Sequence, residues 1–267
     1  MKSMKLYSDV HRIYNNLVAL GIGPQDGLSV AALTPFDQYH YDGTEAVDLA
    51  LSRLDLPAYA RILDIGAGIG GPARYIADTT GAHVTALELQ PDLDDVARDL
   101  TRRCGLAARV THECGDILDG HPRGPFDAII SLLCMLHIPE KHRLFAACRA
   151  ALRPGQAMYI EDFAHSRPLT EAEAESLAVK VQCTQLPTPD EYRAHLAAAG
   201  FSDISITDVT QDWRRVSASR VKAAKAAHDA NVALHGAATV AGLEDFYAAV
   251  DALWQGGALT GLRILAR

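Results

Sequence analysis

A short apolar segment followed by a run of glycines constrains the fold of this chain more than any other feature. Residues 61–65 (Arg-Ile-Leu-Asp-Ile) are short and branched, as in a buried parallel strand, and lead directly into Gly66, Gly68 and Gly70. Glycines turn the chain sharply and leave no side chain between the backbone and a ligand. A helix is predicted to begin near Pro72, because proline is tolerated in the first helical turn.

An acidic residue at the end of the next predicted strand completes this unit. Residues 83–87 form that strand, and Glu88 follows it, 22 residues after Gly66. In a doubly wound α/β sheet, an acid at this distance from the glycine turn holds the hydroxyls of a ribose. The segment therefore predicts a Rossmann-like unit that binds a nucleoside-containing ligand.

Asp64 distinguishes two cofactors that use such a turn. Gly66, Gly68 and Gly71 also satisfy the G-x-G-x-x-G pattern, so an NAD-binding oxidoreductase remains an alternative. A dinucleotide brings a pyrophosphate to the turn, which the Asp64 carboxylate would repel, whereas S-adenosylmethionine brings an ammonium and a sulfonium. The pattern Asp-x-Gly-x-Gly-x-Gly resembles motif I of class I S-adenosylmethionine-dependent methyltransferases, and S-adenosyl-L-methionine is the expected cofactor.

The rest of the chain continues the alternation of strands and helices. Further strands are predicted at residues 108–113, 126–134, 157–163, 201–209 and 259–266. We therefore predict an α/β fold with a Rossmann-like, seven-stranded, mostly parallel sheet whose last strand is antiparallel, as in class I methyltransferases.

Two helical regions lie outside this predicted sheet. Residues 5–20 have the spacing of an amphipathic helix, which serves either as a packing helix or as a lid. Residues 211–255 have a helical pattern where a hairpin would suffice, so they form an insertion, and long insertions at sheet ends are often functional. The expected division is an N-terminal helical lid at 1–56, an S-adenosylmethionine-binding core at 57–210 and 257–267, and a helical cap insertion at 211–256.

Composition indicates a globular protein without the features of a nucleic-acid-binding or membrane-spanning protein. The net charge of −8 gives no basic footprint for nucleic acid. The apolar run at residues 128–136 is too short to span a bilayer. The five cysteines are widely spaced without a C-x-x-C pattern, as is typical of reduced thiols. We expect a cytoplasmic enzyme with a small-molecule substrate, no bound metal, and no nucleic-acid or membrane partner, and the sequence leaves its oligomeric state open.

The candidate cofactor residues share a position at the carboxyl edge of the sheet, where open α/β folds bind ligands. Glu88 is expected to hold the ribose, Asp116 and Ile117 the adenine, and Asp64 and Gly66 the methionine end. The other candidates are Ala67, Gly68, Leu89 and Leu132, together with Gln38, Tyr39 and His40 from a segment rich in groups that stack and hydrogen-bond.

The segment after the fourth predicted strand is where catalysis is expected. Methyl transfer from a sulfonium needs alignment, exclusion of water and removal of a proton from the nucleophile, but no acid for the leaving group. Residues 131–139 contain no Asn-Pro-Pro-Tyr motif and no magnesium-binding Asp, and His137 is their only imidazole. His137 is therefore either a catalytic base or a hydrogen-bonded wall residue.

The whole chain resembles the small-molecule methyltransferases that include sarcosine/dimethylglycine and phosphoethanolamine N-methyltransferases. Four segments carry the resemblance: 37–46, 62–74, 135–137 and 256–259. It implies N-methylation of a small amine or amino acid, and a catalytic pair formed by Tyr7 and His137.

The sequence departs from the phosphoethanolamine enzymes at other positions. Leu132 and Leu133 stand where those enzymes have Arg-Asp. Their phosphate-binding positions correspond here to Ala178, Gln182 and Thr184, so a phosphate would meet few cations. A less charged acceptor is expected, and O-, S- or C-methylation of a small secondary metabolite remains the alternative.

Overall fold

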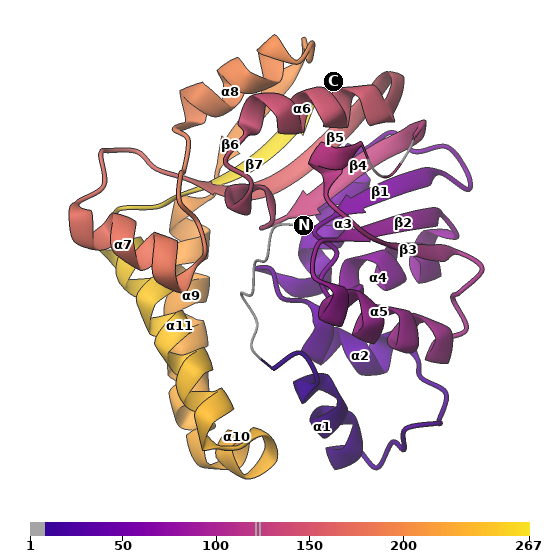
Figure 1. The fold of residues 1–267 in the computed structure, drawn as a ribbon, viewed down its shortest axis with the longest axis vertical. Coiled ribbons are helices and arrows are strands. Elements are labelled where there is room, and N and C mark those ends of the chain that lie inside the picture. Colours follow the sequence, from indigo (N-terminus) through magenta and orange to yellow (C-terminus); the bar gives the residue numbers. More distant parts are fainter. Residues whose placement is uncertain (1–8, 121, 123) are drawn as a thin grey trace.

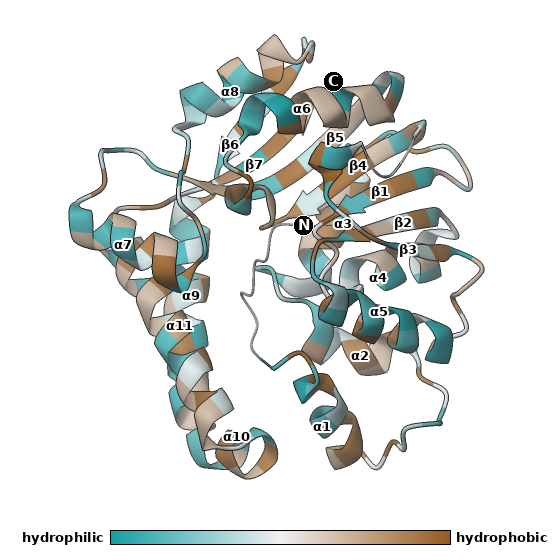
Figure 2. Ribbon diagram, viewed as in Figure 1, coloured by the Kyte–Doolittle hydropathy of each residue, from teal (hydrophilic) through white to brown (hydrophobic). Residues whose placement is uncertain are grey.

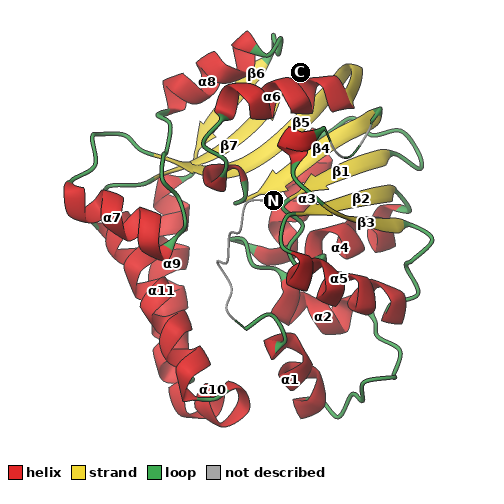
Figure 3. Cartoon of the chain, viewed as in Figure 1, coloured by secondary structure: helices red, strands yellow, loops and turns green. Residues whose placement is uncertain are grey.

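The computed structural model describes residues 9–120, 122 and 124–267, and these form one mixed sheet with helices on both faces (Figures 1 and 3). The strands are β1 (Arg61–Ile65), β2 (His83–Glu88), β3 (Val110–Cys114), β4 (Phe126–Leu132), β5 (Leu152–Ala164), β6 (Ile204–Asp208) and β7 (Thr260–Ala266). Their order is β3-β2-β1-β4-β5-β7-β6. β7 alone runs opposite to the other six strands, so its pairings with β5 and β6 are antiparallel and all other pairings are parallel. The predicted seven-stranded, mostly parallel sheet with an antiparallel last strand is confirmed.

Some of the helices cover the two faces of the sheet, and the others lie beyond the carboxyl ends of its strands (Figure 1). They are α1 (Arg12–Ala19), α2 (Val30–Asp37), α3 (Gly43–Arg53), α4 (Gly71–Thr80), α5 (Pro91–Arg103), α6 (Lys141–Ala151), α7 (Glu171–Lys180), α8 (Pro189–Ala198), α9 (Thr210–Ala226), α10 (His228–His235) and α11 (Ala237–Gln255), with 3₁₀ turns η1 (Ile117–Asp119) and η2 (Met135–His137). None of the helices in the described part of the chain combines the length and apolarity needed to cross a membrane.

Alternating residues of the strands build two hydrophobic cores. On β4, Ile129 packs on the face covered by α6 and α8, while Ala128 and Ile130 pack on the face covered by α3 and α4. Successive side chains of a strand point to opposite faces, so a nearly continuous apolar strand is required when both faces are covered. Figure 2 shows these central strands as the most hydrophobic part of the ribbon.

The insertion between β6 and β7 is anchored to the sheet by tryptophans. Trp213 of α9 and Trp254 of α11 are both fully buried, and both pack against Tyr41 and Phe163. The indole Nε1 of Trp254 donates to the Tyr41 hydroxyl at 3.0 Å. These two tryptophans are core residues, and they hold α9 and α11 at the edge of the sheet where the strands end (Figure 1).

The far end of the insertion meets the N-terminal region. The Thr239 hydroxyl donates to the Asp9 carboxylate at 3.1 Å, and the Asn15 amide lies 3.5 Å from Nδ1 of His235. Figure 1 shows α10, at the end of the insertion that is farthest from the sheet, next to α1 of the N-terminal region. Two segments from opposite ends of the chain therefore meet beyond the carboxyl ends of the strands.

Several predicted boundaries were wrong for local physical reasons. Helix α2 was not predicted, although Ser29 caps it by accepting from the amide of Ala32 at 3.2 Å; Pro35 inside it obscured the pattern. β5 begins at Leu152 rather than at residue 157, because Leu152 already pairs with Phe126 of β4. A register shift in this pairing, where Gly155 has a left-handed φ of 77°, precedes Ala157. β4 ends at Leu132 rather than at residue 134, because Leu133 adopts a left-handed φ of 55°.

Candidate active site

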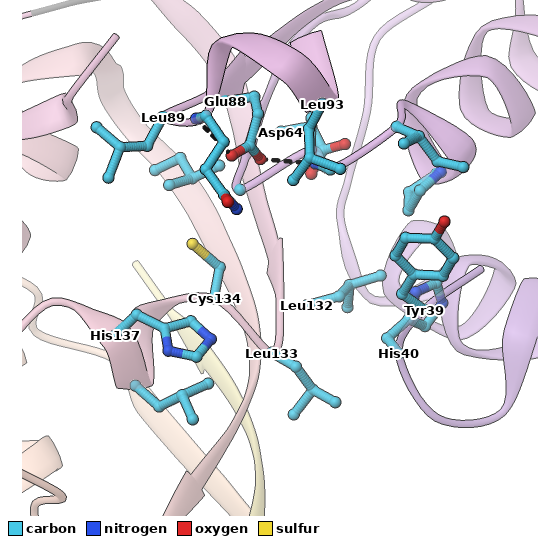
Figure 4. A pocket seen from close by; sticks show the side chains of 18 of the residues that line it. Tyr39, His40, Asp64, Glu88, Leu89, Leu93, Leu132, Leu133, Cys134 and His137 are labelled. Atoms are coloured by element: carbon cyan, nitrogen blue, oxygen red, sulfur yellow. Dashed lines mark hydrogen bonds between the residues drawn. The ribbon is translucent and has the colours of Figure 1, made fainter. Parts of the chain in front are cut away.

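A single cavity at the carboxyl edge of the sheet collects nearly all of the predicted site residues. Asp64, Gly66, Ala67, Gly68, Glu88, Leu89, Asp116, Ile117, Leu132, Tyr39, His40 and His137 all line it. Gln38 does not line it; its side-chain amide instead donates to the Asp37 carboxylate at 2.8 Å. Tyr7 lies outside the described residues. Figure 4 shows Asp64 and Glu88 at one end of the cavity, with His137 and Cys134 across from Tyr39 and His40.

The glycine turn forms one wall because its backbone is tied to β2. The amides of Gly66 and Ala67 both donate to the carbonyl of Leu87, at 2.9 and 3.0 Å. Gly66 has a left-handed φ of 77°, and a Cβ added there would lie 2.2 Å from Sγ of Cys134. A glycine at this position therefore allows both the turn and the close approach of the loop that follows β4.

The carboxyl group of Asp64 is buried without a full set of partners. Its Oδ2 atom has no hydrogen-bond partner among the described residues. Burial, and secondarily the charge of Glu88, raise the pKa of Asp64 to about 7. A buried carboxylate of this kind is costly unless a cation or donor is supplied, so a cationic ligand group fits this place.

Glu88 is held by the backbone on both of its oxygens. Oε2 accepts from the amide of Gly68 and Oε1 from the amide of Gln90, each at 2.9 Å. Burial is the main cause of a raised pKa of this carboxyl group, and the two backbone amides act in the opposite direction. The side chain is therefore fixed in orientation at the end of β2, facing the glycine turn.

A buried ion pair joins the glycine turn to the segment that carries Tyr39 and His40. Arg74 and Asp37 contact at 2.9 Å with both side chains fully buried, and Arg74 also donates to the carbonyl of Ile69 at 2.8 Å. Sequence analysis missed this link, although Arg74 belongs to the segment of resemblance. The imidazole of His40 bonds the carbonyl of Gly43 at 2.9 Å, and burial lowers its pKa to about 4, so it is neutral at physiological pH.

His137 lies on the η2 turn and faces the cavity with one nitrogen. Its Nδ1 lies 3.3 Å from the carbonyl oxygen of Gln182, which only accepts, so the neutral ring carries its proton on Nδ1 and leaves Nε2 as an acceptor. Burial, and then the charge of Lys141, lower the pKa of His137 to about 4. An unperturbed imidazole has a pKa near neutral, and the difference arises from this burial.

Two buried charged groups support the η2 turn. Lys141 donates through Nζ to the carbonyls of Met135 and Ile138, at 2.8 and 2.6 Å. Beneath the turn, Asp162 accepts from the hydroxyl of Tyr192, and burial raises its pKa to about 6. These contacts fix the backbone on both sides of His137, and nothing in the local sequence pattern had indicated them.

The remaining wall of the cavity comes from residues that sequence analysis did not select. They are mostly apolar or aromatic and come from the segment before α3, the loop after β4, the end of β5, the end of α7 and the insertion: Tyr41, Leu133, Leu136, Phe163, Val181, Ser217, Arg220, Phe246, Tyr247 and Val250. The length of the insertion was the only signal for its members. Leu133 adds a strained left-handed backbone at the floor of the cavity, a feature that clusters at functional sites.

Comparison with known proteins assigns a class to this fold and cavity. Residues 62–155 match a family model described as a methyltransferase domain. This segment contains the glycine turn, Asp64, Glu88, Asp116 and the η2 turn. Residues 62–155 are therefore similar to a methyltransferase domain, the class that the sequence predicted.

Individual relatives agree with that class. The chain is 30% identical over 176 residues to methyltransferase GfsG of Streptomyces halstedii, covering 64% of this chain and 63% of that protein. It is 31% identical over 175 residues to phosphoethanolamine N-methyltransferase 1 of Arabidopsis thaliana, covering 65% of this chain and 35% of that protein. The chain thus spans about one third to two thirds of the length of these relatives.

A solved structure agrees on the fold over almost the whole chain. The complex of Haemonchus contortus phosphoethanolamine N-methyltransferase 2 with phosphomonomethylethanolamine and S-adenosylhomocysteine superimposes with a TM-score of 0.82 at 21% identity. The match covers 98% of this chain and 58% of that chain. The N-terminal helices and the insertion are therefore part of a fold that the two proteins share.

Proposed function

We propose that this protein is an S-adenosylmethionine-dependent methyltransferase that acts on a small molecule. The observation that carries the proposal is the pair of buried carboxyl groups, Asp64 and Glu88, on either side of the glycine turn. Asp64 has one oxygen without a partner and suits a cation, and it would repel the pyrophosphate of NAD. The methyltransferase class of residues 62–155 supports the same cofactor.

Each cofactor residue has a proposed role that follows from its place in the cavity. Asp64 and Gly66 receive the methionine end, with Asp64 against the ammonium. Glu88 accepts from the ribose hydroxyls, next to Leu89. Asp116 and Ile117 hold the adenine, at the end of β3. The remaining wall on this side is assigned to Ala67, Gly68 and Leu132, and the opposite wall to Tyr39 and His40.

The proposed mechanism uses His137 as the base. The bound cofactor supplies a methyl group on a positively charged sulfur. An acceptor that carries a proton on its nucleophilic atom must lose it, and Nε2 of neutral His137 is free to accept it because Nδ1 is directed at Gln182. A pKa of about 4 keeps the imidazole neutral at physiological pH, at the cost of basicity. The resemblance adds Tyr7 as the partner that closes over His137.

The two helical regions outside the core are proposed to act as lids. The contacts of Asp9 with Thr239 and of Asn15 with His235 support closure of residues 1–56 and 211–256 over the cavity. Closure would exclude water from the sulfonium and the acceptor. Within this division α3 is anchored to the core, because its Val47 and Ala50 pack beside β1.

Two classes of methyl acceptor are proposed as alternatives. N-methylation of a small amine or amino acid is supported by the similarity to phosphoethanolamine N-methyltransferases. O-, S- or C-methylation of a small secondary metabolite is supported by the apolar wall of the cavity, in which Leu132 and Leu133 stand where the phosphoethanolamine enzymes have Arg-Asp.

Calorimetry and a product screen test this proposal. We expect the purified chain to bind S-adenosylmethionine and S-adenosylhomocysteine, and not NAD. Pools of amines, amino acids, phenols, thiols and thioethers, incubated with S-adenosylmethionine and examined by mass spectrometry, should yield a product heavier by one methylene. Binding of NAD in preference to S-adenosylmethionine would instead identify an oxidoreductase.

A further inference from the structure

Among the described residues, the part of the cavity that the insertion lines contains one cation and no carboxylate. The carboxyl groups that line the cavity are those of Asp37, Asp64, Glu88 and Asp116. Asp37 is paired with Arg74, and the other three lie at the ends of β1, β2 and β3, around the glycine turn. Among the described lining residues, the only lysine or arginine is Arg220, from α9 of the insertion.

Arg220 is held in place but is not neutralised. One nitrogen of its guanidinium donates to the carbonyl of His40 at 2.8 Å. The guanidinium also lies over the ring of Tyr41, 4.9 Å from its centre, and 6.0 Å from the centre of the Tyr247 ring. Within the described part of the chain, no ion pair joins Arg220 to a carboxylate. A guanidinium has five N–H donors, so this one retains the capacity to bind an anion.

Apart from the carbonyl of His40, the two tyrosines and Ser217, apolar residues predominate in the part of the cavity that contains Arg220. Leu133, Leu136, Phe163, Phe246 and Val250 line the same side. A ligand that fills this space needs an apolar body, because polar groups would be buried there without partners. The Ser217 hydroxyl, one turn before Arg220 on α9, is the nearest uncharged polar group on that helix that lines the cavity.

From these features we propose that the methyl acceptor is an apolar molecule that carries one carboxylate, or an equivalent anionic group, and that Arg220 binds this anion. This inference rests on the proposed methyltransferase function and specifies its substrate class. It holds for an amino acid with an apolar side chain as well as for a hydroxy acid, because it concerns the charged group that anchors the acceptor, not the atom that is methylated.

The same geometry disfavours an acceptor whose only charge is positive. Aromatic rings often bind methylated ammonium groups through their faces. Here the guanidinium of Arg220 already lies over Tyr41 and near Tyr247. An acceptor ammonium at those rings would meet this cation and the cofactor sulfonium, and it would have to compete with Arg220 for the ring faces.

Matched acceptor pools test the proposal. Each pool presents the same set of apolar bodies, bearing an amine, a hydroxyl or a thiol, as the free acid, the methyl ester or the primary amide. Methyl transfer is measured by mass spectrometry for the wild type, Arg220→Met and Arg220→Lys. The control is Arg215→Met, also on α9, whose exposed guanidinium pairs with Asp212. Melting temperature and S-adenosylhomocysteine affinity are measured for each variant to establish folding and an intact cofactor site.

We expect the wild type to methylate acids in preference to their esters and amides. A charge-assisted hydrogen bond predicts a loss of roughly 10- to 100-fold in kcat/KM for the acid in Arg220→Met, with most of the change in KM. Arg220→Lys should recover part of the activity, and Arg215→Met should retain all of it.

Three results would overturn the proposal. They are preference of the wild type for esters, amides or simple amines; an unchanged acid preference in Arg220→Met; and no methylation of any acid by a protein that binds S-adenosylhomocysteine. Failure to bind S-adenosylmethionine and S-adenosylhomocysteine at all is a different outcome, because it refutes the methyltransferase function on which the proposal rests.

Discussion

The two halves of the cavity are built in different ways. The half assigned to the cofactor comes from three successive strand ends, so Asp64, Glu88 and Asp116 lie within one stretch of sequence, and backbone amides bind the carboxylates of Glu88 and Asp116. The half assigned to the acceptor combines the loop after β4, the end of β5 and two helices of the insertion. The first half follows from the fold itself. The second half depends on side chains that can be replaced without disturbing the sheet.

The replacement of His137 should have the largest effect, and only on the acceptor half. Loss of a general base typically reduces turnover by about 10²–10⁴-fold. We expect His137→Ala to show this loss in kcat with the accepted substrate, while the affinity for S-adenosylmethionine stays near that of the wild type. Tyr7→Phe, measured in parallel, should lower turnover by a smaller factor if it closes over the imidazole.

A control and a melting curve separate this role from packing. His142→Ala, at an exposed position on α6, should leave turnover unchanged. If His137 only fills space, His137→Ala will lower the melting temperature and leave turnover per folded molecule intact. Near-wild-type turnover in both His137→Ala and Tyr7→Phe would rule out the pair.

The replacement of Glu88 should affect the cofactor half in the opposite pattern. Glu88→Ala removes the acceptor for two ribose hydroxyls and leaves the amides of Gly68 and Gln90 without their side-chain partner. We expect S-adenosylmethionine affinity to fall by about 1–3 kcal/mol, or roughly 5- to 150-fold, as measured by calorimetry. Glu113→Ala, on the adjacent strand and outside the cavity, is the control. Unchanged affinity in Glu88→Ala would refute the ribose assignment.

How far the sequence predicts each half follows from how that half is built. Asp64, Gly66 and Glu88 could be identified because a strand, a glycine turn and a second strand leave a pattern in consecutive residues. Arg220 and Phe246 could not, because they reach the cavity only through the packing of α9 and α11, which Trp213 and Trp254 fix across the sheet edge. Helical periodicity indicates that such helices exist, but not which of their faces meets the ligand.

His137 shows the same limit for chemistry. Its position after β4 was predictable, whereas its pKa of about 4 depends on burial and on Lys141, which contacts the carbonyls of the same turn. Gln38 was selected because it belongs to a polar segment, and its side chain instead donates to Asp37. Direction and burial of a side chain are three-dimensional facts that a local pattern does not contain.

Gly71 tests whether the two halves depend on one another. A Cβ at this residue would lie 2.2 Å from the carbonyl oxygen of Asp37, which must move if alanine is introduced. We expect Gly71→Ala to destabilise the fold by about 1–3 kcal/mol, and to lower the melting temperature by several degrees. The segment of Tyr39 and His40 follows Asp37, and the carbonyl of His40 accepts from Arg220 of the acceptor half. Acceptor turnover should therefore fall as well.

The insertion offers a matched control for this substitution. Gly242 lies within α11 with a helical backbone, and a Cβ there meets no atom within 4 Å. Gly242→Ala should therefore be neutral or should stabilise by up to about 1 kcal/mol, the difference in helix propensity. Equal melting temperatures for Gly71→Ala and Gly242→Ala would show that the contact with Asp37 is relaxed at no cost, and would remove the proposed link.

The smallest expected effect is a pH dependence that belongs to the cofactor half alone. In the free protein, burial and then Glu88 raise the pKa of Asp64 to about 7, so the group binds a proton below that pH. An ammonium ligand favours the carboxylate, so binding below pH 7 must release this proton. The affinity for S-adenosylmethionine should therefore fall as the pH drops below about 7, by at most about tenfold per pH unit, and should be level just above it.

Calorimetry between pH 5.5 and 7.5, in two buffers with different ionisation enthalpies, measures both the affinity and the number of protons released. Asp64→Asn should bind more weakly at pH 7.5 and should lose the acid-side dependence, because it has no proton to release. Arg220→Met, in the acceptor half, should keep the wild-type profile. An affinity that is level from pH 5.5 to 7.5 in the wild type would mean that Asp64 does not face the ammonium. The orphaned Oδ2 atom would then need another partner, and the orientation of the cofactor in this half of the cavity would have to be reversed.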